Sequence, residues 1–144
     1  MEDRSPVGIA RAYLASFGSG DPDAIAALVS DDFRNEHLSE LGAGSTGRDE
    51  YRSRLAEFLG SFVGARYTVE VIGDLVRPAG VEPTGGREVV ARYRFEAEYD
   101  GVPIEIAGVM WFEVDSGLIT RRTDLWDSLT FLRQTGQGDR PVRG

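Results

Sequence analysis

The chain lacks several residue types that enzymes often use for chemistry. It contains no cysteine, which excludes disulfide bonds, thiolate nucleophiles and zinc–cysteine sites. Its single histidine, His37, cannot form a multi-histidine metal centre within one chain. All 16 basic residues are arginine, so Schiff-base chemistry through lysine is excluded as well. Carboxylates, arginines, tyrosines and one histidine remain, and we expect a site that uses neither a metal nor a cofactor.

Long apolar runs and an excess of positive charge are missing too. No segment reaches the length of a membrane-spanning helix, and the opening residues MEDRSPVG lack the basic and apolar regions of a signal peptide, so we expect a cytoplasmic protein. The net charge of −8 argues against nucleic acid and anionic membranes as partners, because both require a cationic surface, and we expect no membrane partner. A small apolar or neutral ligand is the expected partner.

The size of the chain predicts one domain. With 144 residues, of which 41% are hydrophobic, the chain has enough apolar material for one sizeable core and no room for a second. We expect a single domain over residues 1–144, with its core at about 6–136 and a flexible tail over 137–144.

Two kinds of hydrophobic periodicity follow one another along this domain. Ser5 and Asp21, each followed by proline, indicate two helix starts, and apolar spacings of three and four predict a third helix from about Thr46 to Phe62. The polar stretch after Phe33 is expected to be a connection. Beyond it, alternation predicts strands over 67–72 with 74–76, 89–99, 102–114 and 118–127, then a short helix over 128–134. This order predicts an α+β domain in which helices close one face of a curved antiparallel sheet into a pocket.

A carboxylate, Asp124, lies inside what is otherwise the pattern of a core hairpin. If residues 115–117 form a three-residue turn, antiparallel pairing places Asp124 opposite Gly108 and Arg122 opposite Met110. Asp124 would then point into an apolar cavity, where desolvation makes an ionised carboxylate a stronger base. The alternative is a structural aspartate that caps the next helix or pairs with an arginine.

A second turn decides which residues share that face. The pair Asp100-Gly101 favours a two-residue hairpin turn, which places Tyr93 on the face of Asp124. Arg94 and Glu96 would then lie on the other face, in a ladder of opposite charges. A three-residue loop or a bulge would instead bring Arg94 into one row with Asp124. Both registers are open from the sequence.

The segment DDFRNEH after the second helix and the segment TDLWDSLTFLRQ on the last strand carry a family resemblance. Across roughly residues 6–136 the chain resembles the nuclear transport factor 2-like superfamily, and within it SnoaL-like proteins. The resemblance implies a cone of three N-terminal helices against a strongly curved antiparallel or mixed sheet, with a deep pocket. Proteins with this fold and pocket include polyketide cyclases, isomerases, epoxide hydrolases and noncatalytic binding proteins, so the fold alone does not select a reaction.

The resemblance also implies roles for individual residues. Asp124 of TDLWD takes the position of the acid/base aspartate of SnoaL-like cyclases, although Thr123 replaces a tryptophan. Asn35 and His37 correspond to an asparagine and a histidine at the edge of the pocket, which implies that Asn35 orients a water or a substrate carbonyl and that His37 shares in proton transfer. The alternative is that Asn35 caps a turn and that His37 lies in a solvent-facing loop.

Limonene epoxide hydrolase is similar at further positions. Its Asp-Arg-Asp constellation would fall on Asp124, Arg94 and Glu96, and its water-binding asparagine would fall on Asn35. The resemblance then implies that one acid and the asparagine hold a water while the other acid protonates the epoxide. Phe33 stands where that enzyme has a tyrosine, which removes one hydrogen bond to the water.

Apolar side chains suggest both a pocket wall and an interface. Trp111 and Val109 lie on the sheet face opposite Asp124, and this exposed patch predicts a homodimer through the outer face, as the resemblance also implies. The residues that can line the pocket, with plain core packing as the alternative for each, are Tyr13, Phe17, Phe33, Met110, Phe112 and Trp126.

Three functions are consistent with this sequence. The first is a cofactor-independent acid/base enzyme with Asp124 as general base, which cyclises or isomerises a small apolar molecule such as a polyketide or terpenoid, or opens an epoxide. The second is a noncatalytic small-molecule binding module, in which Asp124 recognises a ligand group and nothing reacts. The third is a dimeric domain whose pocket is vestigial.

Overall fold

The two predicted helix starts are confirmed. In the computed structural model, which describes residues 3–81 and 86–138, α1 spans Pro6–Ser16 and α2 spans Pro22–Ala26. The Ser5 hydroxyl and the Asp21 carboxylate accept hydrogen bonds from backbone amides of the first turns, as expected of N-caps. A 3-10 turn, η1 (Phe17–Ser19), lies between the helices.

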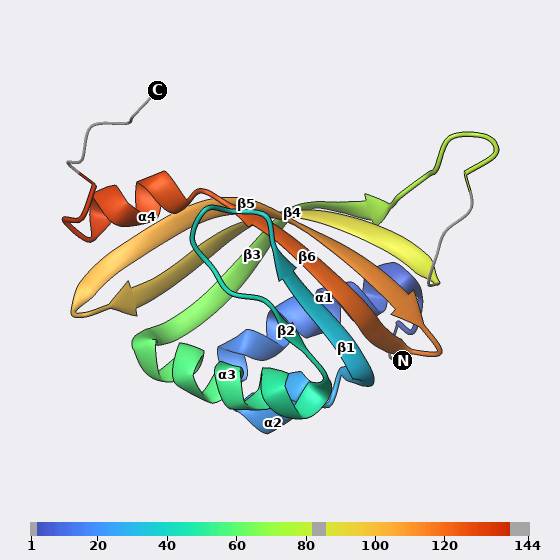
Figure 1. Cartoon of the computed structure of the whole chain (residues 1–144), viewed down its shortest axis with the longest axis horizontal. Helices are drawn as coiled ribbons and strands as arrows, with labels where there is room; N and C mark the ends of the chain where they lie inside the picture. Colours follow the sequence, from blue (N-terminus) through green and yellow to red (C-terminus); the bar gives the residue numbers. More distant parts are fainter. Residues whose placement is uncertain (1–2, 82–85, 139–144) are drawn as a thin grey trace.

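One six-stranded sheet follows, in the order β2-β1-β6-β5-β4-β3. β1 and β6 run parallel and the other neighbours run antiparallel, so the sheet is mixed and the predicted α+β class is confirmed. Figure 1 shows the sheet arching over α1 and α3, with α4 at one end. The remaining elements are β1 Val29–His37, β2 Ser45–Thr46, α3 Arg48–Ser61, β3 Phe62–Asp74, β4 Arg87–Tyr99, β5 Val102–Asp115, β6 Leu118–Trp126 and α4 Ser128–Gln134.

Three elements differ from the sequence prediction: β1, the unpredicted short strand β2, and β3. β1 occupies the segment expected to lead into a polar connection, because pairing with β6 and β2 holds it in place although most of its residues are polar. Phe33 and Asn35 alternate towards the buried face of this strand. Phe62 begins β3 instead of ending the third helix. Gly64, with φ of +68°, lies where the pairing register of β3 and β4 shifts, between Val63 and Arg66.

The hairpin between β4 and β5 has the register that the two-residue turn predicts. Asp100 and Gly101 both have positive φ, 50° and 77°, as a type I′ turn requires. Tyr93 therefore pairs with Gly108, and the side chains of even-numbered residues on β4 turn to the outer face. This outcome removes the register in which Arg94 shares a row with Asp124.

The hairpin between β5 and β6 differs from the predicted register by two residues. The turn contains only Ser116 and Gly117, both with positive φ, and a bulge follows where the pairing shifts between Glu113 and Val114. Each change moves the pairing by one residue, so Asp124 lies opposite Met110 and not opposite Gly108. Because two shifts of one residue restore the alternation, Asp124 still faces the interior.

The core lies between the inner face of the sheet and the helices, chiefly α1 and α3. Tyr13 and Leu14 of α1 and Tyr51 and Leu55 of α3 are buried there. None of the helices in the described residues is both long and apolar enough to cross a membrane. Most of the predicted tail, residues 139–144, lies outside the described part of the chain.

Candidate functional site

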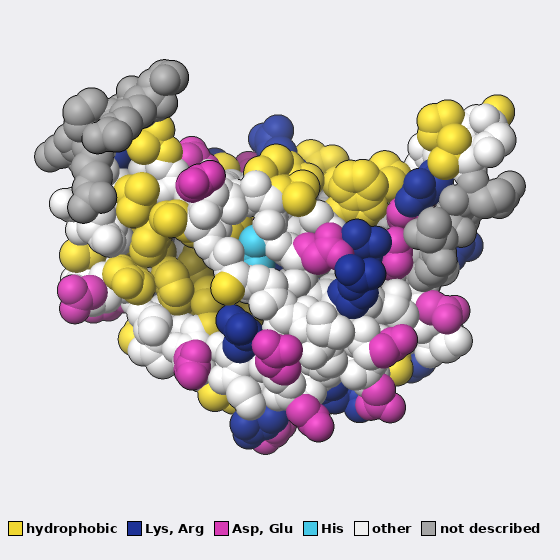
Figure 2. All heavy atoms as spheres, in the orientation of Figure 1, with side chains coloured by type: hydrophobic (Ala, Val, Ile, Leu, Met, Phe, Trp, Pro, Cys, Tyr) yellow, Lys and Arg dark blue, Asp and Glu magenta, His cyan; other side chains and the backbone are white. Residues whose placement is uncertain are grey.

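A cavity of about 470 Å³ opens between α3 and the inner face of the sheet. Figure 2 shows hydrophobic side chains gathered in a hollow between α3 and α4. We use the name polar floor for four buried or half-buried polar residues of its lining: Asn35, His37, Arg122 and Asp124. The rest of the wall is rich in aromatic rings, which suits an apolar ligand: Phe17, Tyr51, Phe58, Phe62, Tyr67, Tyr93, Phe95, Tyr99, Trp126 and Phe131.

Asp124 is paired with a cation instead of standing alone among apolar side chains. Its side chain is buried, and one carboxylate oxygen, Oδ2, accepts a hydrogen bond of 2.8 Å from Nη2 of Arg122. The other oxygen, Oδ1, accepts a bond of 2.6 Å from the Tyr93 hydroxyl. Asp124 lines the cavity and also pairs with an arginine, which is the contact named in the structural alternative. The ion pair forms because residues two apart on β6 face the same side of the sheet.

Gly108 allows Tyr93 to reach Asp124. Tyr93 lies on β4 and Asp124 on β6, with β5 between them. Gly108 is the β5 partner of Tyr93, and a Cβ atom at Gly108 would lie 2.3 Å from the Tyr93 hydroxyl oxygen. The phenol thus crosses β5 through the space that a side chain would fill. Burial raises the pKa of Tyr93, and the negative charge of Asp124 raises it further, so this phenol stays neutral and donates.

Arg122 is held on its other side by two tyrosines. Its Nη1 donates to the Tyr13 hydroxyl at 3.3 Å, and the Tyr13 hydroxyl is hydrogen-bonded to that of Tyr51. The guanidinium carbon also lies 5.9 Å from the centre of the Tyr13 ring. Burial raises the pKa of both tyrosines, so they stay neutral at pH 7. The result is one connected network from Tyr51 through Arg122 and Asp124 to Tyr93.

His37 is a neutral hydrogen-bonding residue of the polar floor. It pairs with Asp124 across β1 and β6, and its Nδ1 accepts a hydrogen bond of 3.2 Å from Nε1 of Trp126. Burial, helped by the charge of Arg122, lowers the pKa of His37 to about 4. At neutral pH the ring is therefore uncharged, and because Nδ1 is an acceptor its single proton is on Nε2. The alternative of a solvent-facing loop is wrong for this residue.

Asn35 is the β1 partner of Arg122. Its side chain is 7% exposed, and its Oδ1 has no hydrogen-bond partner within the described residues. Arg122 Nε has no partner there either. The alternative in which Asn35 caps a turn does not hold, because Asn35 lies within a strand and lines the cavity.

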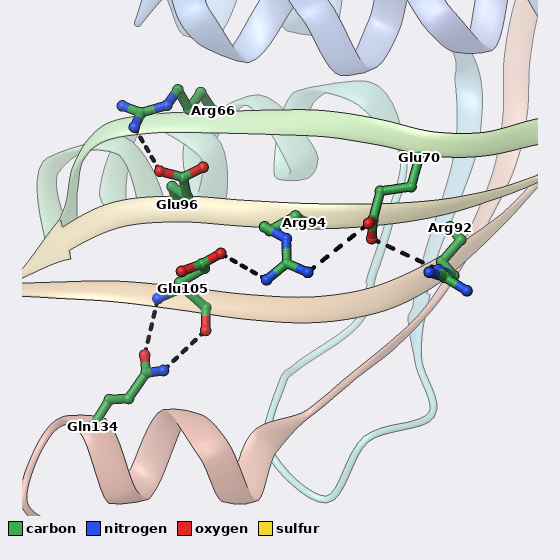
Figure 3. Close-up of polar contacts among 7 residues, drawn as sticks. All are labelled: Arg66, Glu70, Arg92, Arg94, Glu96, Glu105 and Gln134. Atoms are coloured by element: carbon green, nitrogen blue, oxygen red, sulfur yellow. Dashed lines mark hydrogen bonds and ion pairs between the residues drawn. The ribbon is translucent and has the colours of Figure 1, made fainter.

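The five residues predicted to carry catalysis separate into two groups. Asp124, Asn35 and His37 come together in the polar floor. Arg94 and Glu96 lie on the outer face, where Arg94 donates to Glu105 at 2.6 Å and Arg66 donates to Glu96 at 2.6 Å (Figure 3). Their assignment to the site is corrected, because the two-residue turn after Tyr99 directs them away from the pocket.

The predicted wall residues separate as well. Phe17 and Trp126 line the cavity, whereas Tyr13, Phe33, Met110 and Phe112 are buried core residues outside its lining. Arg122 was missed as a member of the site, although its spacing of two from Asp124 placed both on one face. Among residues 3–81 and 86–138, no three acidic or histidine side chains cluster in a way that could hold a metal ion.

Comparison with known proteins assigns the chain to a family. The family model described as SnoaL-like domain matches residues 10–122. No curated protein sequence matches significantly.

Three solved structures illustrate the likeness in fold. A Catenulispora acidiphila protein with a ketosteroid isomerase-like fold, in complex with trimethylamine, is 18% identical over 92% of this chain and 96% of its own, with a TM-score of 0.74. An epoxide hydrolase of the limonene epoxide hydrolase type from M. tuberculosis is 20% identical over 92% and 90%, with a TM-score of 0.70. A candidate polyketide cyclase from Xanthomonas campestris is 24% identical over 88% and 93%, with a TM-score of 0.66.

At these identities the solved structures establish the fold alone. The family match covers most of the chain, from α1 into β6, and its last residue is Arg122 of the polar floor. The chain therefore belongs to the SnoaL-like domain family.

Proposed function

We propose that this protein is a cofactor-independent acid/base enzyme that acts on a small, largely apolar molecule. Asp124 removes a proton from a carbon next to a carbonyl group, and the electron pair moves onto the carbonyl oxygen as an enolate forms. If the enolate is conjugated with a carbon–carbon double bond, return of the proton from Asp124 to the far carbon gives isomerisation. If the enolate attacks a second carbonyl of the same molecule, a ring closes and the new alkoxide takes up the proton. The observation that carries this proposal is the buried Asp124 carboxylate, which pairs in register with the neutral His37 in an aromatic pocket.

His37 supplies the second half of this chemistry. With Nδ1 occupied by Trp126, its Nε2–H group can donate a hydrogen bond to the oxygen on which negative charge develops. A neutral imidazole is a suitable donor for an enolate oxygen. Because its pKa is about 4, His37 does not carry a second proton at pH 7, so we assign it hydrogen-bond donation instead of shared proton transfer.

Epoxide opening is less well supported by the residues present. The reaction needs an acid that protonates the epoxide oxygen while the base activates water. Glu96, the candidate for that acid, is on the outer face. The other carboxylate of the described lining, Glu57, is exposed on α3. A buried partner acid for Asp124 is therefore missing from the described lining.

Noncatalytic binding is the second candidate, and one observation favours it. Both carboxylate oxygens of Asp124 already accept a hydrogen bond, one from Tyr93 and one from Arg122. A carboxylate held in this way can serve as a fixed recognition group for a ligand, with no proton transferred. The Catenulispora protein of similar fold was solved in complex with a small molecule, trimethylamine.

Proton abstraction can be tested without knowledge of the natural substrate. We would incubate the protein with 1-tetralone in D₂O and follow deuterium exchange at the carbon next to the carbonyl by NMR, with binding measured by calorimetry. We expect the wild-type protein to accelerate exchange and Asp124→Asn to abolish the acceleration while ligand affinity is retained. Glu105→Gln, which changes an exposed carboxylate of the outer face, is the control and should exchange like wild type.

The possible outcomes separate the candidates. Acceleration that persists in Asp124→Asn refutes the role of Asp124 as base. Binding without any acceleration in the wild-type protein supports the binding module. If the protein hydrolyses styrene oxide in an Asp124-dependent way but does not exchange tetralone, epoxide opening becomes the favoured function.

We also propose a homodimer through the outer face of the sheet. Trp111, Val109 and Leu125 expose 43%, 38% and 51% of their surface there, on neighbouring positions of β5 and β6. The charged residues beside this patch form ion pairs with one another: Arg92 and Arg94 both lie next to Glu70 (Figure 3). Sedimentation velocity should give a dimer for the wild-type protein and for Ala56→Glu on α3, and a monomer for Trp111→Glu. A wild-type monomer at all measurable concentrations would refute the dimer.

A further inference from the structure

Two polar atoms of the floor have opposite hydrogen-bonding character and no hydrogen-bond partner in the part of the chain that the structure describes. Asn35 Oδ1 is an acceptor without a donor, and Arg122 Nε–H is a donor without an acceptor. Both side chains are more than nine-tenths buried, both line the cavity, and the two residues are register partners on β1 and β6. Because buried polar atoms are nearly always hydrogen-bonded, two complementary unpaired atoms at neighbouring positions indicate a bridging group.

The rest of the Arg122 guanidinium is already engaged. Nη1 donates to Tyr13 and Nη2 donates to Asp124. In a guanidinium the hydrogen on Nε and one hydrogen of the neighbouring terminal nitrogen point along the same edge, as they do in bidentate pairs with carboxylates. Asp124 accepts from Nη2 of the same guanidinium and gives its other oxygen to Tyr93. A group bound at Nε therefore lies close to the Asp124 carboxylate.

The bridging group must accept one hydrogen bond and donate another. A carbonyl or ether oxygen can accept from Arg122 Nε–H but has no hydrogen for Asn35 Oδ1. An ammonium group can donate to Asn35 but cannot accept from Arg122. A hydroxyl group does both. A water molecule has the same two capacities, so a ligand hydroxyl that binds here replaces one water without loss of a hydrogen bond.

We propose that Asn35 and Arg122 form a hydroxyl-binding subsite, and that the ligand of this pocket is an apolar molecule with a hydroxyl group at its buried end. The hydroxyl oxygen accepts from Arg122 Nε–H, and its hydrogen is donated to Asn35 Oδ1. The apolar body then lies against the aromatic wall. This subsite rests on the proposed function and deepens it, because it defines the substrates of the same pocket as hydroxyketones and places the hydroxyl beside Asp124.

A matched pair of ligands tests the subsite. We would measure the affinities of 2-naphthol and 2-methoxynaphthalene by calorimetry at pH 7; the two share an aromatic body, but only the first can donate. We expect 2-naphthol to bind at least about tenfold more tightly in the wild-type protein, because the ether leaves Asn35 Oδ1 unpaired. In Asn35→Leu, which has similar size and no acceptor, the ratio of affinities should fall to about one.

Ser45→Ala is the matched control. Ser45 is the β2 partner of Asn35, and its buried hydroxyl also has no hydrogen-bond partner among residues 3–81 and 86–138, but it does not belong to the described cavity lining. Its loss should leave the ratio between the two ligands unchanged. Thermal unfolding of each variant shows whether it is folded at the assay temperature.

Two results would overturn the proposal. One is a wild-type protein that binds 2-naphthol no better than its methyl ether, or binds neither. The other is a preference for 2-naphthol that survives in Asn35→Leu. If that variant does not fold, a crystal structure of the wild-type protein with 2-naphthol decides, since its oxygen must lie within hydrogen-bond distance of both Asn35 Oδ1 and Arg122 Nε. Failure of the proposed catalysis gives a different pattern: hydroxyl selectivity with no exchange of 1-tetralone.

Discussion

Removal of the Arg122 charge is the sharpest test of the ion pair in the polar floor. Arg122→Met keeps an unbranched apolar stem and deletes the guanidinium, which leaves Asp124 buried with only its bond to Tyr93. The side chains of Arg122 and Asp124 are only 7% and 4% exposed, so water cannot replace the lost cation without a change in structure. The variant therefore leaves a buried charge without compensation.

The expected loss of stability is large. Breaking a buried ion pair by removal of one partner typically destabilises a protein by about 3–5 kcal/mol. Domains have unfolding free energies of only about 5–15 kcal/mol, so this is a substantial part of the total. With a urea m value of about 2 kcal/mol per M, the unfolding midpoint should fall by about 2 M.

A double-mutant cycle measures whether the loss belongs to the pair. Urea unfolding, followed by tryptophan fluorescence, would be compared for Arg122→Met, Asp124→Asn and the double variant. We expect the double variant to be more stable than Arg122→Met alone, because the unpaired charge is gone. Arg94→Met is the control: it breaks an exposed pair with Glu105 and should change stability by less than about 1 kcal/mol. Equal losses for the two arginine variants, or additive losses within the cycle, would refute the reasoning.

Three further predictions follow from the geometry. Gly108→Ala should displace Tyr93 from Asp124, since the new Cβ would lie 2.3 Å from the phenol oxygen; the Tyr93 hydroxyl resonance in NMR and thermal unfolding both report this, and an unchanged spectrum would contradict it. The His37 ring should stay neutral in NMR titrations down to about pH 4. Because an unfolded histidine takes up its proton near pH 6.5, stability should fall as the pH drops from about 6.5 to 4, and His37→Gln should lose this part of the pH dependence. Gly101→Ala should destabilise the protein by about 1 kcal/mol in urea, because its φ of 77° disfavours a side chain; a neutral effect would argue against the type I′ turn.

Local chemistry made part of the fold predictable. The caps at Ser5 and Asp21 depend on a few neighbouring residues and were predicted correctly. The pair Asp100-Gly101 favoured the two-residue turn that the structure has, although the sequence left the longer loop open. β1 was missed because its sequence is polar and its order comes from parallel pairing with β6, which is distant in the chain. The register of β5 and β6 was missed because a short turn and a bulge act together, and neither has a strong local signal.

The sequence by itself determined which chemistry this protein can use. The absence of cysteine and lysine, the single His37 and the acid Asp124 in an alternating strand pointed to a carboxylate on the inner face of a sheet. Alternation survives an even shift in register, and for this reason the inward direction of Asp124 was correct although its partner was not.

Only the tertiary structure decided how that carboxylate is held. Tyr93 reaches Asp124 from another strand through the space at Gly108, and Trp126 sets the tautomer of His37 from 89 positions away in the chain. The direction in which Arg94 and Glu96 point depended on one residue of turn length. These contacts join residues that the chain brings together only when the sheet closes over the helices, and their geometry depends on packing that no local pattern encodes.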